Sequence, residues 1–88
     1  MTYKIVIENK ALAELATLPK KIQRQIANKI DRLSTKAHPS GCKVLKKGKS
    51  LLYRIRSCDY RIVYQIREKQ VLILVVRIAH RKDVYKRL

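Results

Sequence analysis

The groups in this chain that could take part in chemistry near neutral pH gather in its second half. They are Arg54, Arg61, His80, Arg81 and Tyr85. A histidine titrates near pH ~6.5 and can take or give a proton, while guanidinium groups bind phosphate oxygens bidentately. RNA cleavage by its own 2′-hydroxyl group needs a base, an acid and cations around phosphorus. These residue types supply all three, although a lone histidine or tyrosine is also common as a structural residue.

The acidic residues argue against other kinds of cleavage. Six are present and no obvious pair or triad is visible: Glu8, Glu14, Asp31, Asp59, Glu68 and Asp83. Two-metal nucleases and glycosidases depend on such carboxylate groupings. The two cysteines lack the spacing of zinc ligands, and no Walker loop or dinucleotide fingerprint occurs. We therefore expect no metal and no cofactor.

The composition is strongly basic. Twenty-two lysines and arginines against six acidic residues give a formal charge of +16 in 88 residues. A small domain tolerates such self-repulsion when a polyanion or an acidic partner offsets it. The length predicts one domain over residues 1–88. Neither a signal peptide nor an apolar run of about 20 residues is present, so we expect a cytoplasmic protein with no membrane role.

The elements that must position these residues are predicted to form an α+β domain. β-Branched residues favour an N-terminal strand over residues 3–8. Asn9 is expected to cap a first helix with Leu12, Leu15 and Ala16 on one face, and Pro19 to lie near the start of a second. The second helix carries one apolar stripe, formed by Ile22, Ile26, Ile30 and Leu33. The two together predict a helical hairpin.

The second half is predicted to form an antiparallel β-meander. Strands are expected over residues 51–57 and 60–67, joined by a two-residue turn at Cys58 and Asp59. A third strand, over residues 71–78, follows a short turn, and short connections favour antiparallel pairing. A loop and a short basic C-terminal helix complete the chain over residues 79–88.

Strand parity predicts a basic face on this sheet, since alternate side chains share a face. One face would pack on the helices through Tyr60, Ile62, Tyr64 and Ile66, with Leu72, Leu74, Val76 and Ile78. The other would carry Arg54, Arg56, Arg61 and Arg77. Singly, these arginines could be ordinary solvent-exposed residues. The same alternative applies to the basic side of the second helix, which could also extend a nucleic-acid footprint: Lys20, Lys21, Arg24, Lys29 and Arg32.

Two stretches resemble the RelE family of toxin nucleases, within the RelE/ParE superfamily. The first reads YRIRSCDYRIVYQI over residues 53–66, and the second reads VRIAHRKDVY over residues 76–85. The family also shares the order of strand, helical hairpin, meander and short C-terminal helix. The resemblance implies the toxin of a type II toxin–antitoxin system, a ribosome-dependent endoribonuclease that cuts mRNA in the A site without a metal. It also implies a RelB-like antitoxin, and a complex of the two that could bind its own operator DNA.

The resemblance implies roles for individual residues as well. Arg61 and Arg81 would stabilise the scissile phosphate, and Tyr85 would stack on or orient the substrate base. Arg54 replaces a basic residue used for proton abstraction or charge stabilisation. Because arginine hardly loses its proton, part of the proton transfer passes to His80. The expected contacts to RNA phosphates are Lys46, Lys47, Lys49, Arg56, Arg77 and Lys82.

Two other functions stay open at this point. A ParE-like toxin has a related fold and inhibits DNA gyrase without chemistry on RNA. The set formed by Arg61, His80, Arg81 and Tyr85 favours the nuclease, because a gyrase inhibitor has no evident chemical reason to hold it. A basic RNA-binding module would instead bind RNA in a salt-sensitive manner and cleave nothing.

Overall fold

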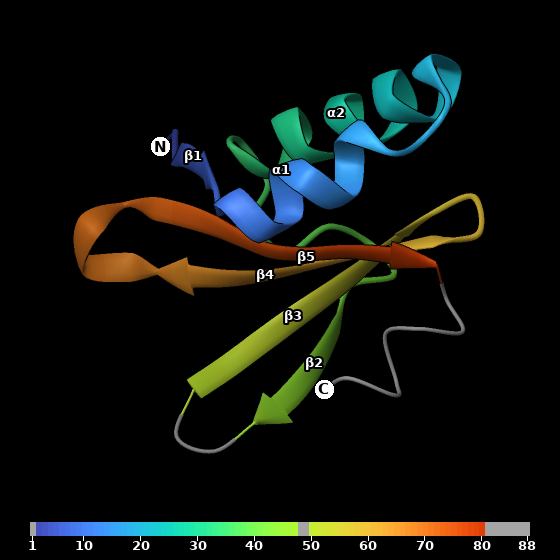
Figure 1. The fold of residues 1–88 in the computed structure, drawn as a ribbon. Coiled ribbons are helices and arrows are strands. Elements are labelled where there is room, and N and C mark those ends of the chain that lie inside the picture. The colour runs from blue at the N-terminus through green and yellow to red at the C-terminus, as the bar shows by residue number, and fades with distance from the viewer. Residues whose placement is uncertain (1, 48–49, 81–88) are drawn as a thin grey trace.

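A computed structural model describes residues 2–47 and 50–80 of the chain (Figure 1). The elements in order are β1 (Lys4–Ile7), α1 (Asn9–Ala16), α2 (Lys20–Leu33), β2 (Lys43–Lys47), β3 (Ser50–Ser57), β4 (Tyr60–Arg67), a 3-10 turn (Glu68–Gln70) and β5 (Leu72–His80). The predicted α+β order is confirmed. The predicted C-terminal helix falls on residues 81–88, outside the described residues, and Ala79 and His80 still belong to β5. Neither described helix is long and apolar enough to cross a membrane.

The five strands form a single sheet in the order β1-β5-β4-β3-β2. The meander from β3 to β5 is antiparallel, as predicted. Two features were not predicted: β2, which pairs with β3, and the parallel pairing of β1 with β5. Because β1 and β2 lie at opposite edges, α1 and α2 carry the chain across one face of the sheet and cover it (Figure 1).

Each helix buries one stripe of side chains against the sheet. In α2 the predicted stripe is confirmed, with Ile26, Ile30 and Leu33 buried. In α1 the prediction is confirmed for Leu15, which packs against the core beside the buried Ala11. It was wrong for Leu12, which is 46% exposed, and for Ala16, which is also exposed. Asn9 is not the cap either. It is already helical, and the N-cap is Glu8, whose side chain makes no capping hydrogen bond.

A β-bulge between β4 and β5 moves side chains from one face to the other. Val63 pairs with Arg77 but Tyr64 pairs with Val75, which leaves Val76 as an extra residue. An extra residue shifts the alternation of faces by one. The main core under the helices therefore includes Ile73, Val75 and Ile78. The prediction that Leu72, Leu74 and Val76 face the helices was wrong, while that for Ile78 is confirmed.

Tyr64 is fully buried in this core, where its hydroxyl group has two partners. It donates to the Ala37 carbonyl at 2.8 Å and lies 3.2 Å from the Cys42 sulfur. Burial and, after it, the contact with Cys42 raise the pKa of Tyr64 above its ordinary value of 10.0. The folded protein therefore holds the phenol proton more tightly than the unfolded chain does. The stability that this provides is complete below pH ~10 and is lost as the pH rises further.

Tyr64→Phe is expected to lower the free energy of unfolding by about 1–3 kcal/mol at neutral pH, because the buried Ala37 carbonyl loses its donor. The variant should also lose less stability than the wild type between neutral pH and pH ~11. Urea denaturation at several pH values measures both effects. Parallel alkaline losses in the two proteins would contradict the assignment of this pH dependence to Tyr64.

Candidate active site

Arg54, Arg56 and Arg61 lie on the sheet face away from the helices. Arg56 pairs directly with Arg61, and Arg54 pairs with Val63. Val63 belongs to a small apolar cluster with Leu52 that is separate from the main core, which identifies the open face. Side chains directly opposite each other in a sheet project to the same face. The basic sheet face predicted from strand parity is therefore confirmed for these three residues. We call the surface that they form the arginine face.

The geometry of the arginine face suits a phosphate group. Arg54 and Arg61 are partly buried and Arg56 is exposed. Guanidinium groups on neighbouring strands can donate in pairs to the oxygens of one phosphodiester. They also keep their charge at any physiological pH. The face can thus bind a phosphate and stabilise negative charge that develops on it.

His80 does not lie on the arginine face. It pairs with Tyr60 across β4 and β5, with the two rings in a T-shaped contact at 5.6 Å between centroids. Tyr60 packs against the core under the helices, whereas Arg61 pairs with Ala79 on the open face. Strand β5 extends to His80, so adjacent residues at its end still alternate between faces. The expectation that His80 joins the arginines was therefore wrong.

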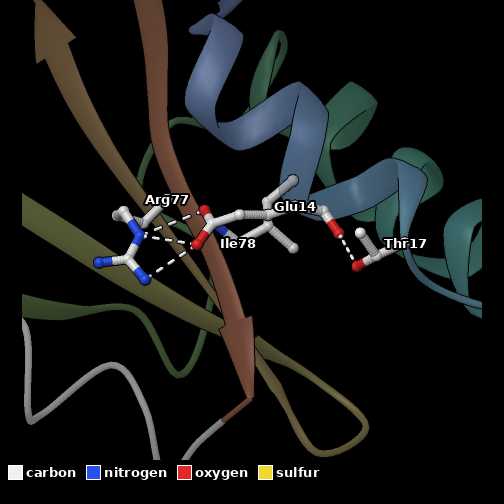
Figure 2. A network of polar contacts seen from close by, with 4 residues as sticks. All are labelled: Glu14, Thr17, Arg77 and Ile78. Carbon is white, nitrogen blue, oxygen red and sulfur yellow. Dashed lines mark hydrogen bonds and ion pairs between the residues drawn. The ribbon is translucent and has the colours of Figure 1, made fainter.

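Arg77 pairs with Val63, as does Arg54, so its register agrees with the predicted face, but its guanidinium group is held by Glu14 of α1 and does not join the arginine face. It is only 6% exposed, and its Nη2 forms an ion pair with Glu14 Oε2 at 2.9 Å (Figure 2). Glu14 also accepts hydrogen bonds from Arg77 Nε and from the Ile78 backbone N–H at 3.0 Å. The short β1 explains how Glu14 reaches Arg77. Because β1 ends where Ile7 pairs with Val75, α1 reaches the edge of β5 beyond that point.

Sequence reasoning missed Glu14 as the partner of Arg77. The two residues are 63 positions apart, and no local pattern connects them. The available signal was an acidic residue in the middle of the first helix of a chain with only six acidic residues. The ion pair shows that Arg77 stabilises the fold, in contrast to the arginines that can bind a ligand.

The remaining predicted site residues divide into two groups. Lys46 and Lys47 belong to β2, at the edge of the sheet, opposite Leu51 and Ser50. The others lie outside the described residues: Lys49, Arg81, Lys82 and Tyr85. The roles of these six residues stay predictions.

The turn between β3 and β4 has the predicted two residues, because Ser57 pairs with Tyr60. Cys58 adopts a left-handed backbone with φ of 55°, which costs a non-glycine residue about 1–2 kcal/mol. Its thiol donates to Gln25 Oε1 at 3.0 Å. Cysteine thus stands where the resembling family commonly has glycine, and the backbone shows why glycine suits the position.

Cys58→Gly is expected to raise the free energy of unfolding by about 0.5–1 kcal/mol, since relief of the left-handed strain exceeds the entropy lost by glycine. Urea denaturation measures the change. Cys58→Ser is the control, because it keeps a donor for Gln25 at the same strained backbone and should bring no gain. A less stable glycine variant would show that the Gln25 contact outweighs the strain.

Comparison with known proteins decides the family. The profile of a family described as ParE toxin of type II toxin-antitoxin system, parDE, matches residues 5–85. The chain belongs to the RelE/ParE family of toxins. This RelE/ParE toxin is 31% identical over 87 residues to a RelE-like toxin protein of Escherichia coli, with 97% of the chain and 92% of the relative covered.

Solved structures of RelE toxins share the fold of this RelE/ParE toxin. The archaeal RelE–RelB complex of Pyrococcus horikoshii OT3 matches with a TM-score of 0.80 and 28% identity, over 92% of this chain and 97% of that chain. The toxin–antitoxin complex RelBE2 of Mycobacterium tuberculosis matches with a TM-score of 0.79 and 21% identity, over 91% and 99%. The isolated E. coli RelE toxin matches with a TM-score of 0.74 and 22% identity, over 97% of each chain.

Proposed function

We propose that this toxin is a ribosome-dependent endoribonuclease that cleaves mRNA in the A site and so inhibits translation. The nucleophile would be the 2′-hydroxyl group of the substrate, with no metal and no cofactor required. It would give its proton to water and form a 2′,3′-cyclic phosphate as the bond from phosphorus to the 5′-oxygen breaks. One observation carries the proposal: Arg56 and Arg61 stand directly opposite each other, with Arg54 beside them on the same open face. Donors fixed around a phosphodiester stabilise the charge that builds up on phosphorus in the transition state.

Each residue of the proposed site has a defined task. Arg54 and Arg61 stabilise the scissile phosphate together with Arg81. Tyr85 stacks on the substrate base or protonates the leaving oxygen. Additional contacts to the RNA backbone come from Arg56, Lys46, Lys47, Lys49 and Lys82. We give His80 no proton-transfer role, because it lies on the other face of the sheet from Arg61, and we omit Arg77, which is paired with Glu14.

We propose in addition that the toxin is neutralised by a RelB-like antitoxin. The solved structures of similar fold include RelE–RelB and RelBE2 toxin–antitoxin complexes. A formal charge of +16 favours an acidic, partly disordered segment that folds on this surface and covers the arginines. Their complex would bind its own operator DNA.

The experiment that tests the nuclease is cleavage of mRNA in ribosomes programmed with a defined codon in the A site. Purified toxin should cut the message at that codon, should leave free mRNA intact, and should lose activity when antitoxin is added. Arg81→Ala and Tyr85→Ala should each abolish cleavage and keep the fold. Normal cleavage by both variants would contradict the proposed site.

A ParE-like inhibitor of DNA gyrase is the second candidate, because the matching family profile carries the ParE name. A supercoiling assay with purified gyrase distinguishes it from the nuclease. Inhibited supercoiling with intact mRNA on ribosomes would establish the gyrase inhibitor in place of the nuclease. Salt-sensitive RNA binding without cleavage or gyrase inhibition would instead identify a plain RNA-binding module.

A further inference from the structure

A second basic surface lies between α2 and β3. Two adjoining pockets, of about 460 and 290 Å³, share three lining residues there: Lys29, Arg32 and Arg56. We call this surface the α2–β3 groove. Cys58, in the turn between β3 and β4, lines the larger pocket, and its thiol donates to Gln25 of α2.

The fold holds these three cations at fixed positions from two separate elements. Lys29 and Arg32 are three residues apart on α2, so they lie on one side of the helix. The residues that anchor this part of α2 are the buried Ile26, Ile30 and Leu33. Arg56 follows the last residue of β3 that pairs with β2, which is Arg54. Beyond that residue no described strand pairs with β3 on this edge, and the two pockets lie there between Arg56 and α2.

Among the described residues, no acidic side chain lines either pocket of the groove. Within residues 2–47 and 50–80, the structure gives Lys29, Arg32 and Arg56 no ion-pair partner. A concave surface lined by one sign of charge concentrates the electrostatic potential and attracts counter-ions. The groove is thus arranged to hold an anion.

The other lining groups indicate which anion fits. Gln25, Asn28, Ser40 and Ser57 also line the two pockets. Their polar side chains can form hydrogen bonds, and such groups commonly contact sugars and phosphates. Arg56 belongs to both basic surfaces, since it pairs with Arg61 on the arginine face and lines the groove. A basic path therefore continues from the open face, around the edge of β3, to α2.

We propose that the α2–β3 groove binds the phosphate backbone of RNA, as a second site beside the one that holds the scissile phosphate. The choice of RNA rests on the proposed function, and the groove gives that function an anchor outside the substrate strand. Lys29 and Arg32 bind phosphates in it, and Arg56 connects the two sites. The remaining basic residues of α2 are then a solvated helix face.

The test compares two double variants of equal charge. K29Q/R32Q removes two positive charges from the groove, and K20Q/R24Q removes two from α2 outside it, since Lys20 and Arg24 line neither of its pockets. Binding to a fluorescent RNA hairpin is measured by anisotropy over a series of salt concentrations. K29Q/R32Q should reduce the slope of log affinity against log salt by roughly 1.4–1.8, as expected for two lost phosphate contacts. K20Q/R24Q should change it by less than about 0.5.

Equal reductions for the two variants would overturn the proposal, because general electrostatics would then explain the binding. A DNA hairpin of the same sequence serves as a second probe. Binding of DNA with the same affinity and the same dependence on Lys29 and Arg32 would overturn the assignment to RNA. All of these measurements are independent of cleavage. If the wild type cuts no mRNA on ribosomes but the variants differ as expected, the nuclease proposal fails and the groove stands.

Discussion

Glu14→Gln is expected to lower the free energy of unfolding by about 3–5 kcal/mol, the usual effect of removing one partner of a buried ion pair. Arg77 is 6% exposed, so its guanidinium group would remain buried without a carboxylate. The Ile78 backbone N–H would lose the charge of its acceptor as well. Small domains have about 5–15 kcal/mol of stability in total. The variant should therefore be marginally stable, as measured by urea or thermal denaturation.

Two controls identify the cause of this loss. Glu8→Gln removes the same charge from an exposed residue that makes no capping hydrogen bond, and should change stability by about 0.5 kcal/mol or less. The double variant Glu14→Leu/Arg77→Leu removes both charges together and should be more stable than Glu14→Gln. If Glu14→Gln lost no more stability than Glu8→Gln, the ion pair would not be a stabilising element.

Arg61→Ala is expected to slow mRNA cleavage on ribosomes by about 10²–10³-fold, the usual effect of removing one donor that stabilises transition-state charge. Arg61 pairs with both Arg56 and Ala79 on the open face, near the start of β4, so it is placed to reach a phosphate lying there. The measurement is the single-turnover cleavage rate at saturating toxin. Arg61→Lys keeps the charge without the planar fork of donors and should recover only part of the rate.

The matched control for this variant is Arg67→Ala on the same strand. Arg67 is exposed at the far end of β4, where its Nε donates to Gln65 Oε1 at 3.0 Å. Its loss should leave the cleavage rate within about twofold, since Arg67 lies at the opposite end of β4 from Arg61 and such surface substitutions usually have small effects. Because Arg61 is partly buried, urea denaturation must show that Arg61→Ala remains folded. Folded Arg61→Ala with a normal rate would refute its role in cleavage.

The parts of the fold that local patterns determine could be predicted from the sequence. The apolar stripe of α2 follows the helical period, and the turn at Cys58 follows from two strands separated by two residues. Strand β2 was missed because its three lysines mask the alternation of apolar and polar residues typical of a strand. It forms through its pairing with β3. The parallel pairing of β1 with β5 joins segments far apart in the chain, and no local signal reports such a contact.

The site was predictable to the extent that strand alternation held. It placed Arg54, Arg56 and Arg61 together correctly. It failed for Leu72, Leu74 and Val76, because the bulge at Val63 and Tyr64 shifts the alternation. It also could not show that Glu14 holds Arg77, because this ion pair depends on the assembled structure. Strand alternation was not applied to His80, because His80 was expected to follow the last strand. It is in fact the last residue of β5.

The position of β5 has a consequence for the synthesis of the toxin. Strand β5 lies between β1 and β4 in the sheet but comes last among the described strands. A nascent chain that has been translated only as far as Gln70 already contains the three arginines of the arginine face, yet it lacks the strand that joins the two parts of the sheet. Long-range pairing of this kind delays folding until the distant segment is present. The ribosome that makes this protein would therefore have synthesised most of the chain before a folded toxin could form next to it.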